Sequence, residues 1–177
     1  AAQGATLTAF CALAEARDNE TGNHIYRTQN YVRALAEYLS EHPRFRQVLD
    51  GETIQQLYKS APLHDIGKVA IPDHILNKPR KLTPEEWAVM QRHAEFGSAV
   101  IVQVESQFPQ TGPSFLRYAR EIAYGHHERW DGSGYPQGLS GAAIPLSARL
   151  MAVADVYDAL ISRRVYKPAF PHEQAIA

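Results

Sequence analysis

Two pairs of adjacent polar residues stand out as candidates for chemistry. His64 and Asp65 lie within "LYKSAPLHDIGKVAIP", a stretch whose other residues are mostly apolar. His126 and His127 open "HHERWDGSGYP", which continues into a glycine-rich, aromatic segment. Polar groups taken from water into a protein core are costly unless they are hydrogen-bonded, paired or bound to a metal. Each doublet offers two nitrogen or oxygen ligands side by side, so both favour metal binding.

Four further residues share this ligand chemistry. Glu20 and His24 are four residues apart and share one face if a single helix includes both. His93 stands at the expected start of another helix, and Asp155 lies within the apolar helical pattern "RLMAVADVYDALI". Taken alone, Asp155 is better explained by an ion pair or a backbone cap. Together with the doublets, these residues indicate a common site.

The combined ligand set suggests more than one metal ion. It has histidines and carboxylates but no thiolate, which suits iron, manganese, zinc, nickel or cobalt. Eight candidate ligands are too many for one ion, because a catalytic zinc uses three protein ligands. We therefore expect two or three divalent ions. The other histidines stand beside prolines or near the chain end and are expected on the surface: His42, His74 and His172.

Helical patterns dominate the elements that must position these residues. We expect an all-α fold, a single domain of about seven helices around the metal site, with no convincing strand. Thr83 and Pro84 are predicted as the N-cap and first residue of one helix, Gly67 as a helix C-cap and Ser147 as an N-cap. A loop rich in glycine and proline is expected over 131–145. The predicted helices cover approximately 7–17, 21–40, 52–66, a segment from 84, 93–104, a helix that "TGPSF" opens and that runs to 124, and 148–162.

Composition narrows the functional class. The chain has 177 residues, 45% of them hydrophobic, which is enough for one folded domain. Its net charge of −1 and the lack of a basic stripe argue against binding long nucleic acid. The only cysteine, Cys11, is expected to be a buried structural thiol, which fits a cytoplasmic location. No stretch is long and apolar enough to span a membrane. The ends of the sequence are typical of a piece cut from a longer protein.

These motifs carry a family resemblance over nearly the whole chain. "LHDIGK" is similar to the signature of the HD superfamily of metal-dependent phosphohydrolases. "HHERWDGSGYP" and "GLSGAAIPLSARLMAVADVYDALISRRVYK" resemble the HD-GYP subfamily specifically. The resemblance implies a helical domain within a longer regulatory protein, with an upstream sensory or receiver domain. It also implies hydrolysis of cyclic di-GMP to linear pGpG, and in some members onward to GMP.

The resemblance also implies roles for individual residues. Asp65 is the expected bridging carboxylate, Lys68 a catalytic cation near the phosphate, and Glu20 the residue that holds a third ion. Trp130 is expected as a core anchor, and Asp158 as a structural partner of an arginine or of a ligand. The substrate-binding residues implied are Tyr135, Arg164 and Lys167. The metal ligands implied are Glu20, His24, His64, Asp65, His93, His126, His127 and Asp155.

Three other functions remain open at this point. The chain could be an HD hydrolase of another nucleotide, although the loop and the basic pair near its end argue against that. It could be a non-catalytic module that senses cyclic di-GMP or docks on GGDEF domains through the Gly-Tyr-Pro loop. It could also be a di-iron oxygenase, since that class resembles HD folds. Iron or manganese is the expected metal, with nickel, zinc and cobalt as further options.

Overall fold

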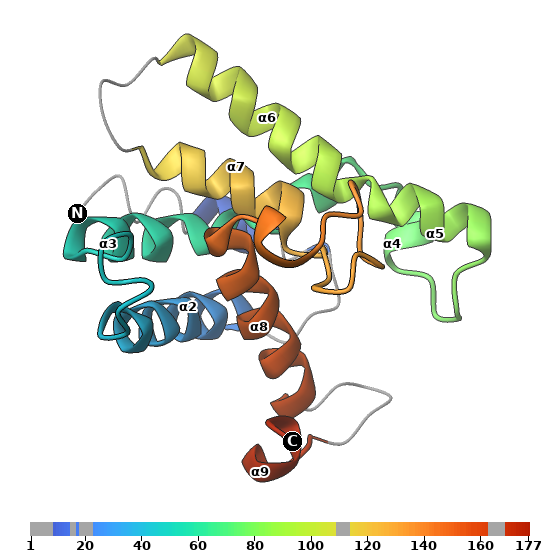
Figure 1. The fold of residues 1–177 in the computed structure, drawn as a ribbon. Helices are drawn as coiled ribbons and strands as arrows, with labels where there is room; N and C mark the ends of the chain where they lie inside the picture. The colour runs from blue at the N-terminus through green and yellow to red at the C-terminus, as the bar shows by residue number, and fades with distance from the viewer. Residues whose placement is uncertain (1–8, 15–16, 18–22, 109–113, 163–168) are drawn as a thin grey trace.

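The protein is built almost entirely of helices (Figure 1). The computed structural model describes residues 9–14, 17, 23–108, 114–162 and 169–177, and residues 9–14 are helical. The other α-helices are α2 (His24–Ser40), α3 (Gly51–Ser60), α4 (Asp73–Leu76), α5 (Pro84–Gln91), α6 (His93–Gln107), α7 (Phe115–Gly125), α8 (Leu146–Ile161) and α9 (His172–Ala175). Three 3-10 helices are η1 (Ala61–Leu63), η2 (Ile66–Ala70) and η3 (Gly141–Ala143). The described residues contain no strand, and their only β-type pairing is an isolated bridge between Asp131 and Ser140. This confirms the all-α class.

The main hydrophobic core lies between four helices. Helix α2 packs against α3 and α8, and α7 packs against α3, α6 and α8. Burial of one apolar face of each helix against the others stabilises this arrangement. None of the helices in the described part of the chain has the length and apolar character needed to cross a membrane. The buried core residues are Val32, Ala36, Leu49, Ile54, Leu57, Ala61, Ile122, Leu150, Met151 and Ala154.

A second apolar cluster joins the N-terminal helical residues to α6 and α7. Cys11 is buried in this cluster, close to Ile101 and Ala119 among others. The prediction that Cys11 is a buried thiol is therefore confirmed. The two clusters leave the ends of several helices between them, and those ends carry the polar residues of interest.

Local sequence signals correctly predicted the start of α5. The Thr83 hydroxyl accepts a hydrogen bond from the Glu86 backbone N–H, and the Glu86 carboxylate accepts one from the Thr83 N–H. Pro84 occupies the first helical position, where its missing N–H has no helical partner to lose. This reciprocal capping fixes the direction of α5.

The predicted helix over 52–66 is wrong at its C-terminal end. Helix α3 stops at Ser60, and η1 and η2 replace its expected continuation. Pro62 gives the reason, because proline cannot donate the backbone hydrogen bond that the next helical turn needs. Gly67 is consequently not a C-cap. It lies where η2 touches α6, and a Cβ there would lie 1.9 Å from the His93 carbonyl oxygen.

Three other predictions need correction. Helix α8 begins at Leu146, and Ser147 does not cap it, because the buried Ser147 hydroxyl donates to the Glu121 carboxylate at 2.6 Å. Trp130 is not a core anchor, since it is 63% exposed, and the Arg149 guanidinium lies 5.9 Å from its ring centre. Helix α2 begins at His24, later than predicted, because Asn23 has a left-handed backbone with φ of 77°.

Candidate metal centre

The predicted ligands lie mostly at the ends of helices that converge between the two cores. His24 is the first residue of α2, and His93 is the first residue of α6. His64 and Asp65 form the turn between η1 and η2, and the second doublet directly follows α7. Asp155 differs, because it lies within α8. Helix ends bring short side chains from distant parts of the sequence into one small volume.

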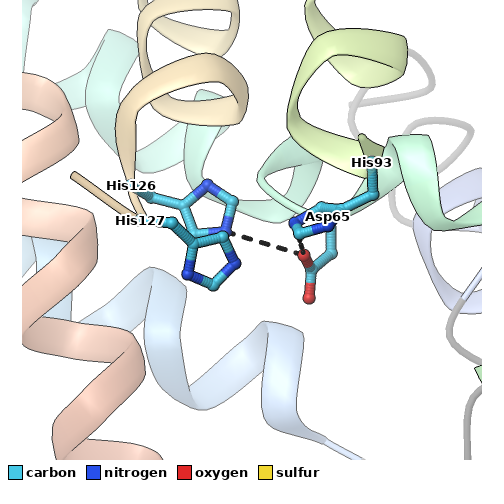
Figure 2. A group of neighbouring side chains, drawn as sticks. All are labelled: Asp65, His93, His126 and His127. Carbon is cyan, nitrogen blue, oxygen red and sulfur yellow. Dashed lines mark ion pairs between the residues drawn. The ribbon is translucent and has the colours of Figure 1, made fainter. Parts of the chain in front are cut away.

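The Asp65 carboxylate points toward both His93 and His126 (Figure 2). Its Oδ1 is 3.3 Å from Nε2 of His93 and 3.6 Å from Nε2 of His126. Its other oxygen, Oδ2, is 3.3 Å from Nε2 of His64. The two carboxylate oxygens of Asp65 therefore face different histidines, which is the arrangement a bridging carboxylate requires.

Two ligand groups result from this geometry. Asp65, His93, His126 and His127 place one ligand atom each within 4.8 Å of one another. The other group consists of His24, His64 and Asp155, under the same distance limit. All seven predicted ligands within the described residues are thus brought together. Both groups have the nitrogen and carboxylate chemistry that suits divalent transition metals.

Backbone carbonyl groups orient three of the histidines. Nδ1 lies 3.0 Å from the Ala61 carbonyl oxygen in His64, 2.8 Å from that of Met90 in His93, and 2.9 Å from that of Ile122 in His126. A carbonyl oxygen only accepts, so each Nδ1 donates its proton there. In the neutral imidazoles Nε2 then carries the lone pair, directed at the centre, which is the tautomer that a metal ligand needs.

His24 is oriented by a carboxylate instead. Its Nδ1 donates to Oδ2 of Asp158 at 2.8 Å, and both side chains are buried. Asp158 also accepts hydrogen bonds from Arg27, at 2.6 Å from Nε and 2.9 Å from Nη2. This confirms the prediction that Asp158 is a structural partner of an arginine or of a ligand. Such a carboxylate makes the imidazole a more basic donor.

Unsatisfied polar atoms at the centre fit a bound cation. Oδ1 of Asp65 and Nε2 of both His93 and His126 are buried without a hydrogen-bond partner. The Nε2 atoms of His24 and His64 lie only 3.3 Å apart. With both Nδ1 atoms donating to their own partners, this contact is favourable when a positive charge, either a proton on one Nε2 or a metal ion, lies between the two rings. Because buried polar groups are normally satisfied, this donor set fits metal ions.

Charge within the site favours a carboxylate at its middle. Burial opposes ionisation of Asp65, but Lys68 and His64 outweigh it and hold the pKa of Asp65 well below its usual range. Burial also lowers the pKa of His64, yet the Asp65 charge prevails and raises that pKa to about 9. Burial lowers the pKa of both His126 and His127. The centre therefore attracts positive charge mainly where Asp65 and His64 meet.

Lys68 and Tyr135 lie beside the candidate ligands, and their predicted roles toward the substrate stay predictions. Nζ of Lys68 is 2.8 Å from Oδ2 of Asp65. The Tyr135 ring stacks on His127, with ring centres 4.7 Å apart and planes inclined by 23°. Burial, and then the Asp65 charge, raise the pKa of Tyr135, so its hydroxyl stays protonated at neutral pH. Tyr135 thus touches the ligand shell itself as well as the edge of the site.

Glu128 is a residue that the sequence did not reveal as important. It is buried, and its two carboxylate oxygens accept hydrogen bonds from the backbone N–H groups of Gln137 at 2.7 Å and Leu139 at 2.9 Å. These bonds fasten the Gly-Tyr-Pro loop beneath the second doublet. The only sequence signal was its position between His127 and a basic residue, and a glutamate there is ordinarily solvent-exposed.

Gly134 explains why this loop can lie so close. A Cβ at this position would be 2.4 Å from the Arg129 backbone nitrogen and 2.5 Å from the His127 carbonyl oxygen. Any side chain would push the loop away. The loop expected over 131–145 therefore packs closely against the residues that follow α7, and this approach requires glycine at position 134.

Three predicted residues lie outside the described part of the chain: Glu20, Arg164 and Lys167. Their roles stay predictions. The three histidines expected on the surface, His42, His74 and His172, are exposed, as predicted.

Comparison with known proteins identifies the family. The HD domain family matches residues 12–177. The chain belongs to the HD domain family. This HD domain is 58% identical over 171 residues to a cyclic di-GMP phosphodiesterase of Vibrio cholerae, a match that covers 97% of this chain and 34% of the relative. The comparisons confirm the resemblance to HD-GYP proteins.

Two further relatives are named for different substrates. A cyclic di-GMP phosphodiesterase response regulator of Xanthomonas campestris is 43% identical over 172 residues, covering 97% of this HD domain and 42% of the relative. A 3'3'-cGAMP-specific phosphodiesterase of Vibrio cholerae is 44% identical over 160 residues, covering 90% and 28%. The chain thus spans well under half the length of these curated relatives.

Proposed function

We propose that this chain is a metal-dependent phosphodiesterase domain that hydrolyses cyclic di-GMP. The observation that carries the proposal is the Asp65 carboxylate, whose oxygens face His93 and His126 on one side and His64 on the other. A carboxylate placed between two ligand groups suits a site with two neighbouring metal ions. The choice of cyclic di-GMP as the substrate rests on relatives that are named cyclic di-GMP phosphodiesterases.

The two ligand groups would each hold one ion, with Asp65 shared. When bound, a metal pair supplies hydroxide near neutral pH and offsets charge on the phosphoryl oxygens. Glu20 is proposed to hold a third ion. Iron or manganese is the proposed metal, and the same donors also accept nickel, zinc or cobalt.

The protein's own residues position the phosphodiester. Lys68, now paired with Asp65 at 2.8 Å, brings an ammonium to the site that stabilises negative charge or passes a proton to the leaving oxygen. Tyr135 covers His127 and restricts water on that side. Arg164 and Lys167 are proposed to contact the dinucleotide, and Arg164 suits forked hydrogen bonds to phosphate or guanine. Linear pGpG is the proposed product, with GMP as a further one.

A second candidate substrate is 3'3'-cGAMP, because a relative specific for it is 44% identical over 160 residues. The two cyclic dinucleotides share the ribose–phosphate ring and differ in one purine base. The ligand groups would serve both equally, so the choice depends on residues that contact the bases.

A non-catalytic role is a weaker alternative. A module that only senses cyclic di-GMP or docks on GGDEF domains through the Gly-Tyr-Pro loop does not need seven converging ligands. Docking as a second role of that loop stays a prediction. A di-iron oxygenase would need oxygen for turnover, so measuring the oxygen dependence of turnover tests this alternative.

The experiment is product analysis on protein purified anaerobically, with metal content measured on the same sample. Cyclic di-GMP, 3'3'-cGAMP and a nucleoside triphosphate are offered in parallel, with and without oxygen. We expect oxygen-independent cleavage of cyclic di-GMP, and loss of both turnover and metal in Asp65→Ala with helical content retained. Asp73→Ala, an exposed carboxylate elsewhere on the surface, is the matched control. An Asp65→Ala protein with normal turnover would refute the proposal.

Two wider expectations stay predictions. One is that residues 1–177 form a single domain of a longer regulatory protein with an upstream sensory or receiver domain. The other is a cytoplasmic location, which was expected from the single free thiol.

A further inference from the structure

Trp87 is a large aromatic residue that the core does not use. It lies on α5, which contributes no buried residue, and Trp87 itself is 47% exposed. Tryptophan is costly to leave in water because its ring is large and mostly apolar. An exposed indole on a short helix therefore calls for an explanation beyond packing of the fold.

The position of Trp87 connects it with the metal centre. Its ring centre is 6.1 Å from that of Tyr135, with the planes nearly perpendicular. Tyr135 in turn stacks on His127 at 4.7 Å and meets His93 edge-on at 6.4 Å. The rings form a continuous series that begins at two ligands and ends in solvent at Trp87.

Within this series Tyr135 and Trp87 differ in what they can offer a ligand. One face of Tyr135 is already covered by His127. Trp87 is the outer member, with much of its ring accessible. The base of a bound nucleotide lies one ribose away from its phosphate. A base platform therefore has to be at the edge of a phosphate-binding centre, where Trp87 is found.

Helix α5 holds Trp87 rigidly enough for this role. The reciprocal capping by Thr83 and Glu86 fixes the first turn, and Trp87 follows directly. The Glu86 carboxylate also accepts from Nζ of Lys78 at 2.5 Å, which ties α5 to the connection before it. A platform that is already positioned loses little conformational freedom on binding.

We propose that Trp87 is a base platform, which stacks on one purine base of the cyclic dinucleotide while the phosphate lies at the metal centre. The inference rests on the proposed function and adds a binding residue to it. Stacking on an aromatic side chain tolerates any base, because every base has a π face. Trp87 therefore contributes affinity for purine dinucleotides in general, and the choice between guanine and adenine is made elsewhere.

The first test compares two substrates on one holoenzyme preparation. Loss of one stacked base corresponds to about a 5- to 150-fold change in affinity. For Trp87→Ala we expect the KM for cyclic di-GMP to rise within that range, with metal content unchanged. Cleavage of glycerophosphocholine, a phosphodiester without any aromatic ring, should keep its rate. Trp87→Phe should restore most of the affinity, because a phenyl ring also stacks.

The second test observes stacking without turnover. The sequence has two tryptophans, so Trp130→Phe leaves Trp87 as the only indole and Trp87→Phe leaves only Trp130. GMP, which has no phosphodiester to cleave, should quench the fluorescence of the Trp130→Phe protein. Ribose 5-phosphate, which has the phosphate but no base, should quench it much less. The Trp87→Phe protein should show no quenching with either ligand.

The results separate this inference from the function it rests on. Equal loss of both substrates in Trp87→Ala would overturn the platform and make Trp87 a support for Tyr135 or the fold. An unchanged KM, or equal quenching by GMP and ribose 5-phosphate, would overturn it as well. Failure of the proposed function itself would be seen in other measurements. Asp65→Ala would keep its turnover, or the wild-type protein would not cleave cyclic dinucleotides, and neither result depends on Trp87.

Discussion

Replacing Asp158 with asparagine tests how the protein prepares His24 for metal binding. Asp158 is buried, with its side chain 2% exposed, and accepts hydrogen bonds from Nδ1 of His24 and from two nitrogens of Arg27. Asparagine keeps the shape but removes the charge. Its single amide oxygen replaces only one of the two carboxylate oxygens, and the NH2 group in the other place faces a donor of Arg27 or His24. The change therefore leaves a partly buried arginine and the proposed metal ligand His24 poorly paired.

Two effects of known size follow. Removing one partner of a buried ion pair costs about 3–5 kcal/mol. Because the Arg27 side chain is 29% exposed, we expect the lower end, about 3 kcal/mol of unfolding free energy. Loss of a carboxylate behind a metal-ligand histidine weakens metal affinity by about 10- to 100-fold. The ion proposed to bind His24 should be affected first.

The stability effect should depend on pH. Burial raises the pKa of Asp158, but hydrogen bonds from His24 and Arg27 outweigh it and lower that pKa from 3.8 to about 2. A depressed carboxyl pKa contributes stability above the unfolded value, and this is lost as the pH falls through the folded value. The shift corresponds to about 2 kcal/mol. The difference in unfolding free energy between the wild type and Asp158→Asn should therefore become smaller as the pH falls from about 4 to about 2.

The assay is urea unfolding of chelator-treated protein at several pH values, with metal affinity measured separately by chelator competition. Asp73→Asn is the matched control. Its carboxylate pairs with Arg17 at 2.7 Å but is 75% exposed, so it should cost no more than about 1 kcal/mol. If Asp158→Asn matches Asp73→Asn in stability and metal affinity, the reasoning about His24 is refuted.

Three further predictions concern other parts of the site. Glu20→Ala should show fewer ions per chain by elemental analysis, and an unchanged stoichiometry and rate would remove Glu20 from the ligands. Arg164→Ala should lower affinity for cyclic di-GMP by roughly one to two decades, as loss of a charge-assisted hydrogen bond predicts, while a generic phosphodiester is cleaved normally. Gly67→Ala should lower the melting temperature strongly, since its Cβ would lie 1.9 Å from the His93 carbonyl oxygen. Gly51→Ala, with nothing within 4 Å, is the control, and equal melting temperatures would contradict the packing argument.

The sequence by itself determined the ligand chemistry and much of the helical framework. Histidine and carboxylate within apolar runs mark a site because the cost of burying them is a property of residue type. Thr83 and Pro84 marked the start of α5 for a similarly local reason, since capping involves only residues within one turn. The resemblance of the motifs "LHDIGK" and "HHERWDGSGYP" to the HD-GYP subfamily then indicated the family before any contact was known.

Only the tertiary structure decided how these residues act together. That Asp65 faces two ligand groups, that Asp158 serves His24, and that Glu128 fastens the Gly-Tyr-Pro loop all depend on contacts between distant segments. The same holds for Gly67, whose small size is needed by α6 and not by its own helix end. Burial and distance arise from packing of whole helices, so no local pattern encodes them. The fold brings separate candidate ligands into one centre because helix ends from four parts of the chain meet there with Asp155 from within α8.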